Sequence, residues 1–82
     1  MSGRLSVVGL GPGGEGLRTP LASKRLAEAT DLVGYGPYLD QVGVLPAEPR
    51  RHASDNRQES ARARVAIELA CRGGRVAVVS SG

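Results

Sequence analysis

The sequence predicts an α/β domain in which a parallel sheet carries flanking helices, and three observations predict it. Short apolar runs end abruptly at glycine, as buried parallel strands do when they reach a loop. Helical signals separate these runs, so that strand and helix alternate along the chain. Aromatic residues make up only 2%, which leaves aliphatic side chains to form the core. We therefore expect one small domain over the 82 residues.

The first strand and the first helix are predicted from residue type. Leu5–Val8 is a β-branched run that meets Gly9, and the strand should end there. Thr19 then provides an N-cap and Pro20 stands at the first helical position, where its missing N–H has no cost. The helix should end near Ala29.

The middle of the chain gives weaker signals. Leu32–Val33 is predicted as the second strand, closed by the loop Gly34–Pro37. Tyr38–Val42 favours a helical turn, and the two prolines of Val44–Pro49 favour a loop. The segment Arg50–His52 is too polar to assign, and His52 is interpreted as a surface residue in a loop.

The last third predicts a long helix and a clear strand. Ser54 or Asp55 would cap the helix, and Gln58 completes a capping box with Asp55. Gly73–Gly74 supplies a left-handed end, and Val76–Val79 is a continuous apolar strand. The apolar stripe of the helix should comprise Ala61, Val65, Leu69, Ala66 and Ala70.

Composition and charge exclude several classes of function. A single cysteine rules out an internal disulfide framework and a cysteine-based metal site, so the cytoplasm is the expected compartment and no metal is expected. No apolar stretch approaches the ~20 residues of a membrane span. The net charge of +3 comes from arginines spread along the chain, without the stacking aromatics of a nucleic-acid site. We expect no membrane and no nucleic acid among its partners.

Gly9, Gly11 and Gly14 have the G-x-G-x-x-G spacing of a dinucleotide site, but the context disagrees. The helix signal waits until Thr19, and Pro12 removes an N–H from the turn where a phosphate would need one. An acid should also follow at the carboxyl end of the second strand, whereas Asp31 precedes that strand. An NAD site is therefore disfavoured.

Ligands of parallel sheets bind outside the carboxyl ends of the strands. Three loops should therefore face one crevice, namely Gly9–Gly16, Gly34–Pro37 and Ser80–Gly82. With three strands, the sheet would also have unpaired edges, which favour association.

Four segments in order resemble the tetrapyrrole methylase family. They are "VVGLGPGGEGLRTP", "ATDLVGYGPYLDQV", "SDNRQESARARVAIELA" and "RVAVVSSG". "VGYGPYLD" and "SDNR" are most similar to the branch that methylates precorrin-3B at C17 in cobalamin biosynthesis, with ring contraction to precorrin-4. The resemblance implies an S-adenosylmethionine-dependent methyltransferase, usually a homodimer, with two α/β domains around a cleft. Residues 1–82 would be the truncated N-terminal part of such an enzyme, without its second domain and inactive alone.

The resemblance also implies the site residues. Cofactor binding is expected at Gly11, Pro12, Gly13, Ser81 and Gly82. Substrate binding is expected at Tyr35, Gly36, Asp55, Asn56 and Arg57. Some relatives carry a catalytic aspartate where this chain has Gly36, so no catalytic base is assigned.

Several alternatives stay open. The glycines could serve only a tight turn, Asp55 only a helix cap, and the two tyrosines only to pack over the end of the sheet. The substrate would carry many carboxylates, for which arginine forks are suitable partners, and the candidates by position are Arg18, Arg50, Arg51 and Arg57. The alternative function is a nucleotide-binding or regulatory α/β module.

Overall fold

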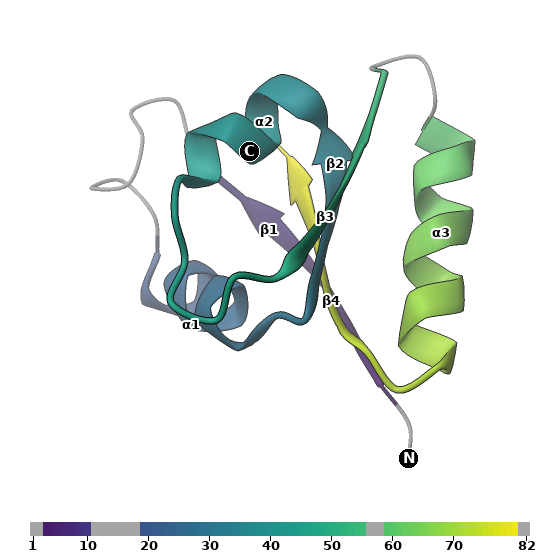
Figure 1. Ribbon diagram of the computed structural model, residues 1–82, viewed down its shortest axis with the longest axis horizontal. Helices are drawn as coiled ribbons and strands as arrows, with labels where there is room; N and C mark the ends of the chain where they lie inside the picture. Colours follow the sequence, from purple (N-terminus) through teal and green to yellow (C-terminus); the bar gives the residue numbers. More distant parts are fainter. Residues whose placement is uncertain (1–2, 11–18, 56–58, 81–82) are drawn as a thin grey trace.

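The computed structural model describes residues 3–10, 19–55 and 59–80. Strands and helices alternate through most of this part of the chain, in agreement with the sequence (Figure 1). In chain order they are β1 (Arg4–Gly9), α1 (Pro20–Glu28), β2 (Asp31–Tyr35), α2 (Gly36–Val42), β3 (Arg50–Ser54), α3 (Glu59–Cys71) and β4 (Arg75–Ser80).

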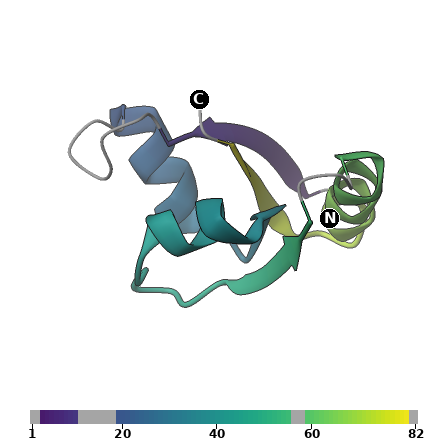
Figure 2. The ribbon, with the colours of Figure 1, turned by 90° about the horizontal axis from the view of Figure 1, so that it is seen from above.

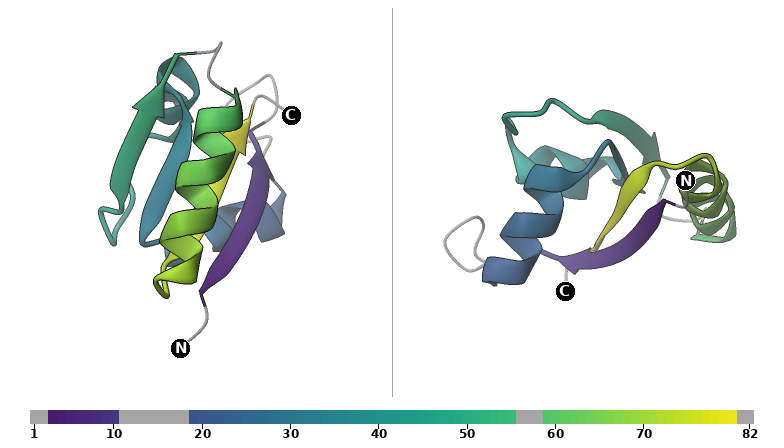
Figure 3. Two further views of the ribbon diagram at one scale, coloured as in Figure 1. Left: turned by 90° about the vertical axis from the view of Figure 1, so that its right-hand side faces the viewer. Right: turned by 90° about the horizontal axis from the view of Figure 1, so that it is seen from below.

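The described strands form one parallel sheet in the order β1-β4-β2-β3. Of the described helices, α1 and α2 lie on one face of this sheet and α3 lies on the other (Figures 2 and 3). The register places Gly9 opposite Ser80, and Tyr35 opposite Ser54. The carboxyl ends of all four described strands therefore meet at one edge, which we call the carboxyl edge, and their beginnings form the amino edge.

Aliphatic side chains fill both layers, as the low aromatic content requires. The larger cluster lies under α1 and α2, where Leu26 and Leu32 are fully buried against Ala77 and Val79. The smaller cluster, under α3, consists of Val33, Ala66 and Val76 with partly buried neighbours. Alternate residues of each strand thus face opposite layers, which is how both faces of a parallel sheet become covered.

Local signals predicted the two helix ends correctly. Thr19 has extended backbone angles, and its hydroxyl accepts a hydrogen bond from the Ala22 N–H at 3.0 Å, as an N-cap does. Pro20 occupies the first helical position. Gly73 has a φ of 93°, a left-handed conformation that side chains disfavour, and Gly74 donates to the Leu69 carbonyl at 3.0 Å.

A fourth strand, β3, corrects the expected sheet of three. The segment that was too polar to assign pairs with β2 along its whole length, from Arg50 opposite Asp31 to Ser54 opposite Tyr35. Ser54 is therefore the last residue of a strand, and the expectation that it caps the following helix is wrong. Polar residues are tolerated here because β3 is an edge strand of the described sheet, where one side of the strand stays open.

The boundaries around β2 also differ from the expectation. Gly34 and Tyr35 continue the strand, and Gly36 with Pro37 begins α2, so that no separate loop closes β2. A side-chain carbon at Gly34 would lie 3.0 Å from the Val79 carbonyl oxygen, so any larger residue would require β4 to shift away from β2. Asp31, expected to precede the strand, is its first residue.

Helix α3 buries a narrower stripe than predicted. Ala66 is buried against the sheet and Leu69 and Ala70 are partly buried, as expected. Ala61 and Val65 are exposed, however, because α3 packs mainly over β4, β2 and β1, and the side of the helix toward β3 is less covered. Gln58, which the sequence pairs with Asp55 in a capping box, lies outside the described residues.

Candidate functional site

The carboxyl edge brings together the strand ends that the sequence predicted to face one crevice. Gly9 and Ser80 are opposite each other at the ends of β1 and β4, and the Leu10 N–H donates to the Ser80 carbonyl at 2.9 Å. The described ends of β1 and β4 therefore lie side by side. On the other half of the edge, Tyr35 and Ser54 end β2 and β3 in register.

Most of the predicted site residues lie outside the described part of the chain. These are Gly11, Pro12, Gly13, Asn56, Arg57, Ser81 and Gly82, together with Arg18. The strand ends that precede them are described, and all of these ends belong to the carboxyl edge. The remaining predicted residues, Tyr35, Gly36 and Asp55, are described and are considered in turn.

Tyr35 and Tyr38 form an aromatic pair at this edge. Their ring centroids are 5.2 Å apart with an interplanar angle of 84°, an edge-to-face contact of the favoured kind. Both are partly buried, and Tyr38 packs against the core under α1 and α2. The interpretation that the tyrosines pack over the end of the sheet agrees with this contact and with the packing of Tyr38.

Gly36 lies between the two tyrosines at the start of α2. A side-chain carbon built there would meet no atom within 4 Å, so neither packing nor backbone angle requires glycine at this position. The space next to the Gly36 backbone is therefore open among the described residues.

Asp55 is exposed directly after β3, and an arginine that the sequence did not single out holds this turn. Nη1 of Arg62 donates to the Asp55 carbonyl at 2.8 Å and to the Ser54 hydroxyl at 3.2 Å. The Ser54 hydroxyl lies 3.5 Å from the Gly34 carbonyl. Arg62 therefore ties the first turn of α3 to the ends of β3 and β2. In the sequence it resembled one more solvated arginine of a helix, and no local signal distinguished it.

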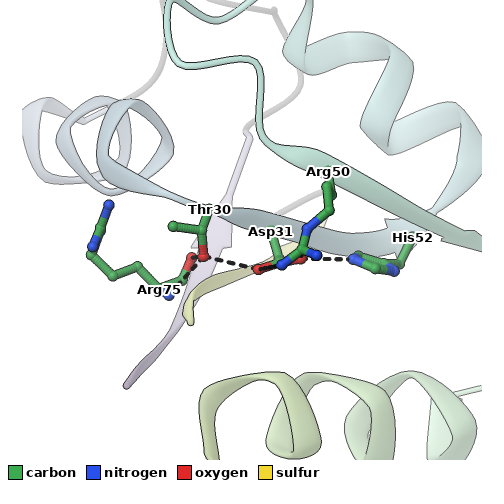
Figure 4. A network of polar contacts seen from close by, with 5 residues as sticks. All are labelled: Thr30, Asp31, Arg50, His52 and Arg75. Carbon is green, nitrogen blue, oxygen red and sulfur yellow. Dashed lines mark hydrogen bonds and ion pairs between the residues drawn. The ribbon is translucent and has the colours of Figure 1, made fainter. Parts of the chain in front are cut away.

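A second polar cluster lies at the amino edge, where Asp31 is fully buried (Figure 4). Its Oδ1 is 2.9 Å from Nε2 of His52 and 3.1 Å from Nε of Arg50. Its Oδ2 accepts from the Thr30 hydroxyl at 2.8 Å. The Arg75 N–H in turn donates to the Thr30 hydroxyl at 2.9 Å, which connects the cluster to β4.

These contacts lower the pKa of Asp31. Burial alone raises that pKa, but the hydrogen bonds from His52 and Thr30 and the positive charge of Arg50 outweigh burial. The carboxyl group is therefore ionised at neutral pH and holds β2 to β3. His52 thus belongs to a strand and contacts a buried carboxylate, which corrects its interpretation as a surface residue of a loop.

Arg50 and Arg51 do not lie near the expected crevice. They begin β3 and so stand at the amino edge, opposite the carboxyl ends. Arg51 points to the other face from Arg50, and its guanidinium donates to the carbonyls of Leu39, at 2.7 Å, and Gly43. The expectation that both arginines bind substrate carboxylates at the crevice depends on a loop at Arg50–His52, whereas these residues belong to β3.

The position of Asp31 agrees with the case against an NAD site. Dinucleotide sites use an acid at the carboxyl end of the second strand to bind the ribose, whereas Asp31 begins β2 at the opposite edge. β2 ends at Tyr35, and Gly36 follows it as the first residue of α2, so that no acid stands at this end of the strand.

Among the described residues, no group of three or more His, Cys, Asp or Glu side chains could hold a metal ion. No described helix is long and apolar enough to cross a membrane.

Comparison with known proteins agrees over the full length of the chain. The family model described as "Tetrapyrrole (Corrin/Porphyrin) Methylases" matches residues 4–82. The cobalamin biosynthesis protein CobIJ of Mycobacterium tuberculosis (strain ATCC 25618 / H37Rv) is 55% identical over 82 residues, all of this chain and 16% of that protein. The precorrin-3B C(17)-methyltransferase of a Sinorhizobium species is 45% identical over 82 residues, 32% of its length.

A solved structure confirms the architecture. The chain in the crystal structure of the methyltransferase CobJ superimposes on this one with a TM-score of 0.90 and 51% sequence identity. The match covers 99% of this chain and 34% of that chain. The present chain thus spans about a third or less of the length of these relatives, and the α/β arrangement with its parallel sheet is the one found in the corresponding part of CobJ.

Proposed function

This chain belongs to the tetrapyrrole (corrin/porphyrin) methylase family, and we propose that it is part of a methyltransferase that uses S-adenosylmethionine to methylate precorrin-3B at C17 in cobalamin biosynthesis. Ring contraction to precorrin-4 accompanies the transfer in this proposal. The observation that carries it is the 45% identity, over all 82 residues, to the Sinorhizobium enzyme whose name states the C17 reaction.

The half of the carboxyl edge formed by β1 and β4 is suitable for S-adenosylmethionine. That molecule supplies a methyl group activated by a sulfonium cation and carries no phosphate. At this half of the edge the described strand ends are Gly9 and Ser80, which are small and uncharged. Small residues allow close backbone approach, and a cationic ligand is not repelled there. We assign cofactor binding to the loops that these strands enter, at Gly11, Pro12, Gly13, Ser81 and Gly82.

The other half of the edge, at β2 and β3, is assigned to the tetrapyrrole. Tyr35 and Tyr38 offer partly exposed ring surface for a flat, conjugated ligand, and Gly36 leaves space beside them. Asp55, Asn56 and Arg57 follow β3 at the same edge. In this division the chain's own residues position two ligands side by side, and positioning provides much of the rate of a direct displacement.

The activity belongs to a protein of the relatives' length. Because this chain corresponds to 34% of the CobJ chain, the residues described here would form one wall of a cleft. We therefore propose that the 82 residues alone do not transfer methyl groups, that a second domain completes the cleft, and that the complete enzyme is a cytoplasmic homodimer.

One observation favours a second candidate, a nucleotide-binding or regulatory module. Gly9, Gly11 and Gly14 keep the literal spacing of a dinucleotide turn after a parallel strand. The position of Asp31 at the amino edge argues against that candidate, since no acid remains at the end of β2 to bind a ribose.

Binding measurements separate the two candidates. The protein is titrated in a calorimeter with S-adenosylmethionine, with S-adenosylhomocysteine and with NAD. We expect both sulfur compounds to bind with micromolar affinity, about −8 kcal/mol, and NAD to give no signal at millimolar concentration. Tight binding of NAD without any response to S-adenosylmethionine would reject the methyltransferase in favour of the nucleotide-binding module.

A further inference from the structure

A pocket of about 200 Å³ lies between β3 and α3, on the face of the sheet opposite α1 and α2. Its floor and walls are formed by Val33, His52, Ala53, Ser54, Ala61, Arg62 and Val65. Most of these side chains are apolar, and the polar groups are a hydroxyl, an imidazole and one guanidinium. Such a lining is suitable for a short aliphatic arm that ends in a negative charge.

Arg62 is the guanidinium among the residues that line this pocket, and its two Nη1 hydrogen-bond donors, out of five N–H groups, are directed to the end of β3. Nη1 donates to the Ser54 hydroxyl and to the Asp55 carbonyl, and these contacts hold the guanidinium at the end of β3, whose last residues also line the pocket. No hydrogen bond among the described residues uses Nε or Nη2. The guanidinium is thus held in place with donors left over, and a planar fork held in this way matches the two oxygens of a carboxylate.

The other polar groups of the pocket are already engaged. Nε2 of His52 is held by the buried Asp31, and the Ser54 hydroxyl bridges Arg62 and Gly34. Asp31 is fully buried and interacts with Arg50, His52 and Thr30. Among the ion pairs between described side chains, none involves Arg62. The side chain of Arg62 is only partly exposed, so that a carboxylate bound there is less screened by water than on an open surface.

We propose that this pocket receives one carboxylate-bearing side arm of the tetrapyrrole, with the Arg62 guanidinium as the partner of the carboxylate; this rests on the function proposed above. The methylene groups of an acetate or propionate arm would contact Val33, Ala61 and Val65. Ser54 is in register with Tyr35, which places the pocket beside the half of the carboxyl edge assigned to the tetrapyrrole.

S-adenosylmethionine also carries a carboxylate, and the order of the strands distinguishes the two sources. The pocket lies at β3. Strand β2 separates β3 from β4, and β2 and β4 together separate it from β1. With a strand spacing of about 4.8 Å, β3 is roughly 10 Å from β4 and 14 Å from β1, whose loops are assigned to the cofactor. The larger, many-armed ligand is the one that extends this far along the edge.

The test compares acid and ester forms of the ligand. Dissociation constants are measured by absorbance titration for precorrin-3B, for its carboxylate methyl ester and for S-adenosylmethionine, using the protein at the full length of its relatives. The variants are Arg62→Met, which removes the charge at similar length, Arg62→Lys, which keeps the charge without the fork, and Arg64→Met as the matched control. Arg64 is exposed on the same helix, and no hydrogen bond or ion pair of the described residues involves it.

We expect Arg62→Met to weaken binding of the acid about 10- to 100-fold, as the loss of a charge-assisted hydrogen bond does, and Arg62→Lys to weaken it less. Binding of the ester and of S-adenosylmethionine should change less than twofold, and Arg64→Met should change nothing. Urea midpoints of all variants check that the fold is kept.

Three outcomes would overturn the inference. If Arg62→Met binds the acid as the unmodified protein does, Arg62 is not its partner. If the variant loses acid and ester equally, Arg62 has only a structural role at the β3 end. If it loses S-adenosylmethionine instead, the carboxylate is that of the cofactor. An unmodified protein that binds no tetrapyrrole in either form would reject the proposed function itself.

Discussion

Nε2 of His52 lies 2.9 Å from Oδ1 of Asp31, a carboxylate that is fully buried at the beginning of β2. The two residues are on neighbouring strands, with His52 two positions beyond Arg50, the residue in register with Asp31. Together with Arg50 this contact holds the edge strand β3 to the rest of the sheet. The pocket and the turn at the other end of β3 depend on that attachment.

Asp31→Asn is expected to destabilise the protein. The amide keeps the size of the side chain but removes the negative charge that Arg50 and His52 contact, and it places an NH₂ group in a buried position. We expect a loss of about 1–3 kcal/mol in the free energy of unfolding. Urea denaturation measures it, with Asp40→Asn, at an exposed position of α2, as the control expected to stay within about 0.5 kcal/mol.

The contribution of Asp31 to stability should depend on pH. Because its pKa is lowered in the folded protein, the contribution is present above the pKa of the unfolded chain, about 3.9, and is lost as the pH falls through the lower folded value. The difference in unfolding free energy between the unmodified protein and Asp31→Asn should therefore shrink below about pH 4. A difference that widens toward pH 3 would contradict the assignment of an ionised, stabilised carboxylate.

Two neighbouring glycines should respond oppositely to alanine. In Gly34→Ala the new carbon would lie 3.0 Å from the Val79 carbonyl oxygen, which belongs to the central ladder and cannot move freely. We expect a loss of about 1–3 kcal/mol, as for overpacking of a core. Gly36→Ala meets no atom within 4 Å, and at the start of α2 it should be neutral or stabilising by up to about 1 kcal/mol. Thermal denaturation of both variants distinguishes them, and equal losses would argue against the close approach of β2 to β4.

Thr19→Ala should weaken the start of α1. The substitution removes the hydroxyl that accepts from the Ala22 N–H, which costs about 1 kcal/mol in the free energy of unfolding, whereas Thr19→Ser should keep most of it. Ser23→Ala, exposed in the same helix, serves as the control in the same denaturation series. If Thr19→Ser were as destabilising as Thr19→Ala, the hydroxyl would not be the stabilising group.

Much of the fold follows from short stretches of sequence because its causes are local. The apolar runs at β1 and β4, the cap at Thr19 and the left-handed Gly73 each depend on residue types within a few positions. The carboxyl edge could be predicted for the same reason. Each predicted strand runs into glycine or serine residues, and in a parallel sheet the strand ends that do so lie at the same edge.

The missed features have partners far away in the sequence. The residues around Arg50 and His52 are too polar to indicate a strand from the sequence alone. Their side chains contact Asp31 of the neighbouring strand β2, and this contact becomes visible only once the strands are paired. Because β3 was not predicted as a strand, Arg50 and Arg51 were interpreted as loop residues near the crevice. In the structure they begin β3 and so lie at the amino edge. Arg62 was overlooked because its role depends on where β3 ends.

We propose that this chain forms part of an enzyme that methylates precorrin-3B, and transfer of a labelled methyl group tests this proposal. The most direct test incubates the protein, at the full length of its relatives, with precorrin-3B and S-adenosylmethionine carrying a ¹³C-labelled methyl group, and locates the label by NMR. We expect one label at C17 of a ring-contracted product, one S-adenosylhomocysteine for each label, and no transfer by the 82-residue chain alone. A full-length protein that transfers no label, yet binds NAD tightly, would contradict the account.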